Sequence, residues 1–184
     1  MNTDQDSLAP FKAPMTRELL VYWQGLCRAD AIPDSAEFID RVPSRFVPHL
    51  MLFDCLADDV LVRFHGSALI ARRGADQTGQ SWMANNPTLS REATLVNVWT
   101  LVRQRCGLLT LAHFVTSTRR HLRVEAFSLP LAVAAGRPPR VVNISLALDT
   151  MGYDERAMGW HGPVAAAWVD AGFGVPRDAP LPLS

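Results

Sequence analysis

Hydrophobic residues near the start of the chain recur with the spacing of an amphipathic helix. After Thr16, whose hydroxyl can cap a helix N-terminus, apolar side chains follow at intervals of three and four positions. The stripe consists of Leu19, Tyr22, Trp23 and Leu26. A second helix is predicted between Asp34 and Pro43, with Glu37 placed to complete a capping box. The first quarter of the chain is therefore predicted to be helical.

The period then changes to that of β-strands. Residues 49–56 are apolar, and residues 60–65 alternate with Phe64 in the inward phase. The pair Asp58-Asp59 between these runs is typical of a turn. The two runs therefore predict a hairpin.

Two further helices are predicted after this hairpin. One is short, covers residues 67–73 and is closed by Gly74. The other covers residues 91–105, begins after Ser90 and is the most regular helix of the chain. Its apolar face is predicted to consist of Leu95, Val98, Trp99 and Val102.

The last part of the chain contains three runs that are typical of strands, at residues 108–115, 121–129 and 140–148. Residues 163–171 are predicted to form a C-terminal helix with Pro163 at its first position. Because the strands cluster and are joined by short links, we expect an α+β fold, not α/β. The predicted sheet is antiparallel and five-stranded, with the short helices and the long helix on one face.

The predicted helices and strands divide the chain into four segments. We expect one domain with extensions, as its 184 residues allow. The segments are a flexible arm over 1–14, an N-terminal helical segment over 15–47, a core over 48–149 and a C-terminal tail over 150–184.

Composition narrows the class of protein. The chain is 48% hydrophobic and carries 18 basic and 18 acidic residues, which excludes a mainly disordered chain. No uncharged apolar run approaches the roughly 20 residues that a membrane span needs. The polar start, Met1–Gln5, is unlike a secretory signal, and three widely separated cysteines do not suggest a disulfide framework. We therefore expect a cytoplasmic protein with free thiols and no membrane partner.

Charge is distributed unevenly along the chain. Residues 61–123 carry nine basic and two acidic side chains, whereas residues 1–60 carry five basic and ten acidic ones. Arg119, Arg120 and His121 cluster at a predicted strand turn. No sequence signature of a nucleic-acid-binding fold accompanies these bases. We expect this cluster to face solvent or an acidic protein surface, and we expect no nucleic-acid partner.

Several short motifs occur in the order found in one known family. The first motif is the Leu-x-x-Tyr-Trp helix of Leu19, Tyr22 and Trp23, and further short motifs follow it. Each motif alone is weak, but their order and spacing together are more specific. The further motifs are Pro48-His49-Leu50, Asp54, Arg63-Phe64, Gly66, Leu69, Thr78-Gly79, Glu125 and Pro130-Leu131. Over residues 17–148 the chain resembles the bacterial stand-alone PAS domain proteins. The resemblance implies a PAS-like fold, and it implies sensing, dimerisation or partner docking without deciding among them.

The departures from known PAS chemistries bear on cofactors. If this chain were a haem-binding PAS sensor, the resemblance would imply an axial histidine on the long helix, but residues 90–106 contain no histidine. A flavin photoreceptor would resemble Asn-Cys-Arg-Phe before that helix, whereas this chain has Ala84-Asn85-Asn86-Pro87. Haem and flavin are therefore not supported by motif, and the cofactor is left unknown. No metal site is expected, although His113 and His121 could meet across a hairpin.

A ligand pocket is expected between the long helix and the sheet. The residues predicted to line it are Phe64, Leu95, Trp99, Val102 and Glu125. Such a lining would favour a small apolar ligand. The alternative is that side chains fill this space and that no ligand binds. For Glu125, the alternative to a ligand contact is a cross-strand ion pair with an arginine.

These expectations lead to a regulatory protein rather than an enzyme. About 36 residues follow the last predicted strand, too few for a kinase or cyclase domain, so a sensor of this kind would act on a protein partner in trans. The exposed stripe of Leu19, Tyr22, Trp23 and Leu26 would form a homodimer interface. The alternative is a small α+β enzyme of the cone-shaped isomerase or dehydratase kind, with Glu125 and His113 as its acid–base candidates.

Overall fold

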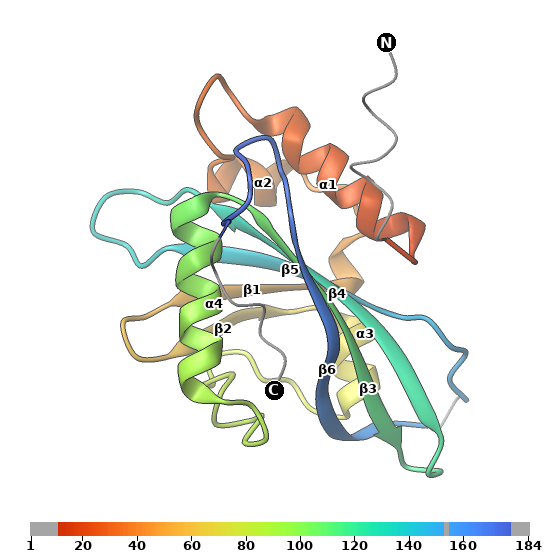
Figure 1. Ribbon diagram of the computed structural model, residues 1–184. Helices are drawn as coiled ribbons and strands as arrows, with labels where there is room; N and C mark the ends of the chain where they lie inside the picture. The colour runs from red at the N-terminus through yellow and green to blue at the C-terminus, as the bar shows by residue number, and fades with distance from the viewer. Residues whose placement is uncertain (1–10, 153–154, 178–184) are drawn as a thin grey trace.

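A six-stranded antiparallel sheet forms the centre of the structure, a computed structural model that describes residues 11–152 and 155–177. Its strand order is β2-β1-β5-β4-β3-β6 (Figure 1). The helices are α1 Pro14–Leu26, α2 Ser35–Arg41, the 3-10 turn η2 Val47–His49, α3 Ser67–Arg73 and α4 Arg91–Gln104. The strands are β1 Leu50–Cys55, β2 Val60–His65, β3 Gly107–Thr116, β4 His121–Leu131, β5 Arg140–Ala147 and β6 Ala157–Val169.

Capping residues begin α2 and α4 as the sequence predicts, whereas Thr16 lies inside α1 and does not cap it. The side chain of Asp34 accepts hydrogen bonds from the backbone of Ala36 and Glu37 and begins α2. Ser90 accepts from Ala93 and begins α4. α1 starts at Pro14, two residues before the predicted start, because proline is well suited to the first turn of a helix.

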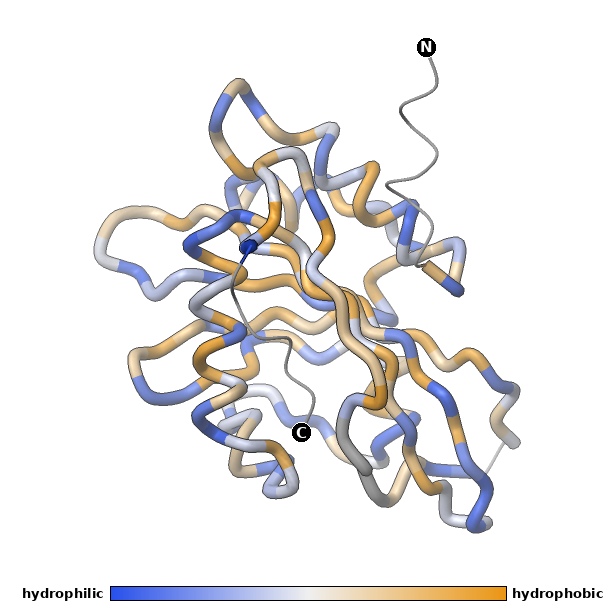
Figure 2. Tube along the Cα trace, viewed as in Figure 1, coloured by the Kyte–Doolittle hydropathy of each residue, from blue (hydrophilic) through white to orange (hydrophobic). Residues whose placement is uncertain are grey.

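The sheet is covered on both faces: α3 and α4 lie together on one face, as predicted, and α1 and α2 cover the other. On one face, α1 and α2 pack with Phe46 and with residues of β4 and β5 such as Phe127 and Ile144. On the other face, α3 and α4 pack with residues of β1 and β2 such as Phe53 and Val62. Figure 2 shows the hydrophobic positions concentrated along the strands and the hydrophilic ones in the connecting loops. The apolar runs of the strands reflect burial on two sides.

The sixth strand replaces the predicted C-terminal helix. Residues 157–169 pair with the whole length of β3, from Ala157 beside Thr116 to Val169 beside Gly107. This pairing satisfies the main-chain groups that a terminal β3 would leave open. Pro163 lies where the register shifts, a position that tolerates a residue without an N–H group.

The predicted arm and tail are described only in part. Residues 1–10 of the arm and residues 153–154 and 178–184 of the tail lie outside the described residues. Among the helices that the structure does describe, none combines the length and the hydrophobicity needed to cross a membrane.

Candidate ligand cavity

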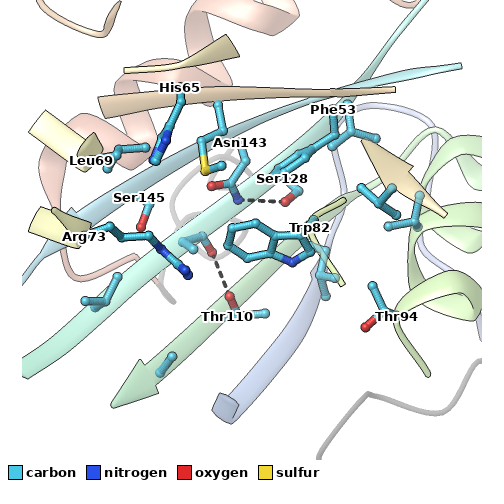
Figure 3. A pocket seen from close by; sticks show the side chains of 18 of the residues that line it. Phe53, His65, Leu69, Arg73, Trp82, Thr94, Thr110, Ser128, Asn143 and Ser145 are labelled. Atoms are coloured by element: carbon cyan, nitrogen blue, oxygen red, sulfur yellow. Dashed lines mark hydrogen bonds between the residues drawn. The ribbon is translucent and has the colours of Figure 1, made fainter. Parts of the chain in front are cut away.

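A cavity of about 160 Å³ lies between the sheet and the pair α3 and α4. It is lined mostly by apolar side chains of the strands. These are Met51, Phe53, Val60, Leu108, Ala112, Phe114, Val124, Ala126 and Val141. Figure 3 shows that polar side chains, among them His65, Arg73, Thr110, Asn143 and Ser145, enter the same space. An apolar cavity with a few convergent polar groups is the usual form of a small-molecule site.

Helix α4 contributes Thr94, Val98 and Leu101 to the cavity wall. These residues follow the spacing of a single helical face. The face differs by one position from the predicted one, so Leu95 and Val102 pack beside the cavity in the core and do not line it. Trp99 also lies outside the lining, with the guanidinium of Arg103 5.5 Å from its ring centroid.

The segment between α3 and α4 closes the cavity from the side of β2. Gly74 ends α3 with a φ of 78°, a left-handed conformation that glycine adopts without strain. The chain then pairs with β2, since Val62 N donates to Gln80 O at 3.0 Å and Trp82 N donates to Val60 O at 2.8 Å. This pairing holds the Trp82 ring in the cavity wall, where it meets Phe53 edge-on at 5.4 Å.

Two adjacent arginines from the last turn of α3 line the cavity. Arg72 reaches strand β5, where its Nη2 donates to the Ser145 hydroxyl at 2.6 Å. Arg73 Nη2 donates to Asn86 Oδ1 at 2.9 Å, and its guanidinium lies 4.8 Å from the Trp82 ring centroid. Burial lowers the pKa of Arg72 to about 10, and the positive charge of Arg73 contributes to this lowering as a smaller cause. Burial also lowers the pKa of Arg73. Both remain charged at neutral pH.

His65 is a fully buried polar residue in the cavity wall. Its Nδ1 accepts the backbone N–H of Gln77 at 3.1 Å, which assigns the ring proton to Nε2. Nε2 has no hydrogen-bond partner among the described residues. Burial lowers the pKa of His65, with Arg73 and Arg72 acting in the same direction and Asp76 opposing them. The ring is therefore a neutral donor that faces a cavity.

A β-bulge explains why His65, and not Phe64, lines the cavity. Opposite β2, the register shifts between Leu52 and Phe53, so that Phe53 pairs with Val62 while Leu52 pairs with Phe64. The residue of β2 between Val62 and Phe64 is therefore left over, and it reverses the side-chain alternation that the sequence suggests. Phe64 thus packs against the core on the α1 side of the sheet.

Glu125 was predicted in the pocket but lies on the opposite face of the sheet. It is 2% exposed, it is not part of the cavity lining, and its hydrogen-bond partners are backbone groups instead of the arginine of the alternative interpretation. Its carboxylate accepts the backbone N–H groups of Lys12 at 2.7 Å and Ala13 at 3.1 Å. His113 alternates with the cavity residues Ala112 and Phe114, so it shares the face of Glu125. The acid–base candidates of the enzyme alternative therefore lie away from the cavity.

The residues predicted to form a dimer interface belong largely to the protein core. Leu19 and Trp23 are fully buried against the sheet of their own chain, and Trp23 Nε1 donates to Pro130 O at 2.8 Å. Tyr22 and Leu26 are partly buried and pack against the same core. The buried face of α1 is formed by Thr16, Leu19, Leu20 and Trp23, which is a small rotation from the predicted stripe.

The structure also shows where the predicted basic cluster and the histidine pair lie. Arg120 of the predicted basic cluster pairs with Glu155 at 3.2 Å, and Arg123, two residues beyond His121, pairs with Asp149 at 2.6 Å. His113 lies opposite Arg123 and not opposite His121, so the two histidines do not form a cross-strand pair. The described residues contain no group of three or more potential metal ligands.

Arg72, Arg73 and His65 line the cavity although no sequence pattern singled them out. The two arginines were part of a correctly predicted helix, and His65 ended a correctly predicted strand. Arginines in the last turn of a helix are ordinarily exposed, where they interact favourably with the helix dipole, so the local sequence gives no signal that these two are buried. Only the packing of α3 against β5 shows that both side chains reach the cavity.

Comparison with known proteins bears on the fold and the family. A family profile described as a PAS domain matches residues 11–145. No curated protein sequence matches the chain. Among solved structures, a fungal LOV domain photoreceptor is similar, with 16% sequence identity and a TM-score of 0.44. That similarity covers 73% of this chain and 90% of the other chain.

Proposed function

Because the chain belongs to the PAS domain family, we propose that it is a sensory module that binds a small molecule in the cavity between the sheet and α3 and α4. The observation that carries the proposal is the cavity itself. A space of about 160 Å³ is comparable to one that holds a benzene ring, and it is more than the core needs for packing.

The proposed output is a change in helix position that a protein partner recognises in trans. A ligand in the cavity would contact α3 through Leu69, the following segment through Trp82 and α4 through Val98. α3 and α4 pack on the sheet through side chains, and the segment that carries Trp82 pairs with β2 through main-chain hydrogen bonds. A ligand that fits one arrangement better than another would shift the population towards it.

We favour binding over catalysis for this cavity. Among the described residues, its lining contains no aspartate or glutamate that could serve as the acid–base group of a small isomerase. The carboxylate of Glu125 is on the other side of the sheet and is occupied by two backbone N–H groups.

A homodimer remains part of the proposal, but through a different surface from the predicted stripe. On α1, Val21 is 55% exposed and points away from the core that holds Leu19 and Trp23. We therefore place the proposed contact on the outer face of α1. A Val21→Asp variant is expected to dissociate the dimer in sedimentation experiments, while Met158→Asp, at an exposed apolar residue of β6, leaves it intact.

Native mass spectrometry of freshly purified protein tests ligand binding. We expect a reproducible added mass per chain in the wild type. In Ala126→Phe the larger side chain fills the cavity, so the added mass should disappear while the fold is retained. Hydrogen exchange should show slower exchange in α3, α4 and the intervening segment when the ligand is present. A wild-type protein that carries no added mass and shows no exchange change with any tested compound would contradict the proposal.

A further inference from the structure

The charged groups of Arg72 and Arg73 line the cavity, and no aspartate or glutamate of the described part of the chain lines it with them. The hydrogen-bond partners that the described residues offer are neutral, Ser145 for Arg72 and Asn86 for Arg73. Elsewhere in the sheet a partly buried arginine has an acidic partner, since Arg140 Nε lies 2.9 Å from Asp54 Oδ1. Adjacent guanidinium groups that are withdrawn from water and share no anion raise each other's electrostatic cost.

A third donor is directed into the same cavity. His65 is fully buried, and its Nε2 has no partner among the described residues although it carries the ring proton. A buried donor without an acceptor is costly, and in a cavity wall it indicates a position that a ligand oxygen can occupy. Figure 3 shows His65, Ser145 and Arg73 on one side of the cavity, and Phe53 and Thr94 on the opposite side.

The cavity therefore has a cationic, donor-rich side, and next to it lie the aromatic rings of Trp82 and Phe53. Resting on the proposed ligand-binding function, we propose that its ligand is a small carboxylate with an apolar body about the size of one aromatic ring. The carboxylate pairs with Arg73 and Arg72 and accepts the Nε2 proton of His65. The apolar body lies against Phe53 and Trp82.

The chemistry of the donors favours a carboxylate over a neutral polar group. A guanidinium presents parallel N–H groups that match the two oxygens of a planar carboxylate. The volume of about 160 Å³ limits the apolar body, because a cavity of about this size accommodates a benzene ring. A neutral ligand would leave both charges uncompensated.

Calorimetric titration of the full chain with three probes that share one ring tests this inference. The probes are benzoate, neutral benzyl alcohol and phenyl phosphate. We expect benzoate to bind at least about tenfold more tightly than benzyl alcohol, because hydrogen bonds to charged groups are the strong ones. Phenyl phosphate binding more tightly than benzoate would overturn the carboxylate assignment in favour of a phosphate.

Charge-removing variants locate the effect. In Arg73→Met, benzoate binding should weaken at least about tenfold while benzyl alcohol binding stays within about twofold. His65→Phe should weaken benzoate by a smaller factor, since it removes one neutral donor. The matched control is Arg103→Met, the same change on the exposed side of α4, which should alter neither. Circular dichroism and thermal unfolding verify that each variant is folded. Arg73→Lys is a second variant at the same position, and it keeps the positive charge but lacks the paired N–H groups of a guanidinium.

The outcomes separate this inference from the proposed function. If the wild type binds benzyl alcohol as tightly as benzoate, and Ala126→Phe abolishes both, the cavity binds ligands but the carboxylate inference is wrong. If Arg73→Met leaves benzoate binding unchanged, the inference is also wrong. If neither probe binds the wild type, the inference fails, and the added mass in native mass spectrometry decides the proposed function independently.

Discussion

The carboxylate of Glu125 accepts the backbone N–H of Lys12 at 2.7 Å and thereby joins strand β4 to the segment that leads into α1. Its other oxygen accepts the N–H of Ala13 at 3.1 Å. Glu125 thus provides hydrogen-bond acceptors at the N-terminal end of α1, where the helix dipole also favours negative charge. A residue predicted to contact a ligand instead fixes the helix that covers the opposite face of the sheet.

Replacing Glu125 should loosen α1. Glu125→Ala leaves two N–H groups without an acceptor, so we expect the free energy of unfolding to fall by about 1–3 kcal/mol. Hydrogen exchange should accelerate over residues 14–26 more than in α3 or α4. The control is Glu18→Ala, which breaks the exposed pair with Arg45 and should cost less than about 1 kcal/mol. Equal losses in the two variants would contradict the anchoring role.

Two tryptophans should differ in their contribution to stability. Trp23 is fully buried and hydrogen-bonded to Pro130, so Trp23→Ala should cost about 3–5 kcal/mol in urea unfolding. From the sequence alone, Trp99→Ala would be expected to cost as much. Because Trp99 lies outside the cavity lining and is only partly buried, we expect no more than about half of that loss. A larger loss for Trp99→Ala than for Trp23→Ala would show that the roles are reversed.

Two glycines should respond in opposite ways to alanine. A Cβ at Gly107 would lie 2.5 Å from Cε2 of the Phe127 ring, which is buried, so Gly107→Ala should destabilise the fold by about 1–3 kcal/mol. A Cβ at Gly25, inside α1, meets nothing within 4 Å. Gly25→Ala should therefore stabilise the protein by up to about 1 kcal/mol, since alanine favours helix. Thermal unfolding measures both, and a stable Gly107→Ala protein would mean that Phe127 can move.

Protonation of His65 should weaken the fold in mild acid. Burial lowers the pKa of His65 below its ordinary value of 6.5, so the unfolded chain binds a proton more readily than the folded one. This stability is present above pH 6.5 and is lost as the pH falls through the lower folded pKa. Urea titrations between about pH 5 and pH 8 should show a slope that His65→Gln reduces.

Burial also lowers the pKa of His49, and Arg72 acts in the same direction. The variant His49→Gln must therefore be measured beside His65→Gln. The slope should be reduced by each change and nearly removed in the double variant. An unchanged slope in His65→Gln would mean that the pKa of His65 is the same in the folded and unfolded chain, contrary to the lowering that burial causes.

Residues close together in the sequence determined the parts that were predicted correctly. Asp34 and Ser90 begin helices through hydrogen bonds to residues two or three positions away, and Gly74 ends one. The turn at Asp58-Asp59 and the hairpin of β1 and β2 also depend on local contacts. Such signals can be recognised in a sequence because both partners lie within one turn of helix or one hairpin.

Contacts between distant segments decided the rest. The bulge opposite Leu52 and Phe53 turned Phe64 away from the cavity and His65 into it. Residues 157–169 became strand β6 because β3 offered unpaired main-chain groups, although the alanines among them favour a helix.

The sequence by itself determined the α+β class, most element positions and the resemblance to PAS domains, because each of these is written in local spacing. Only the tertiary structure decided which side chains meet around the cavity. Arg72, Arg73 and His65 come from two consecutive elements, but their surroundings include β5, which lies about 70 residues further along the chain. A burial environment of this kind is a property of the packed sheet, and no local pattern records it.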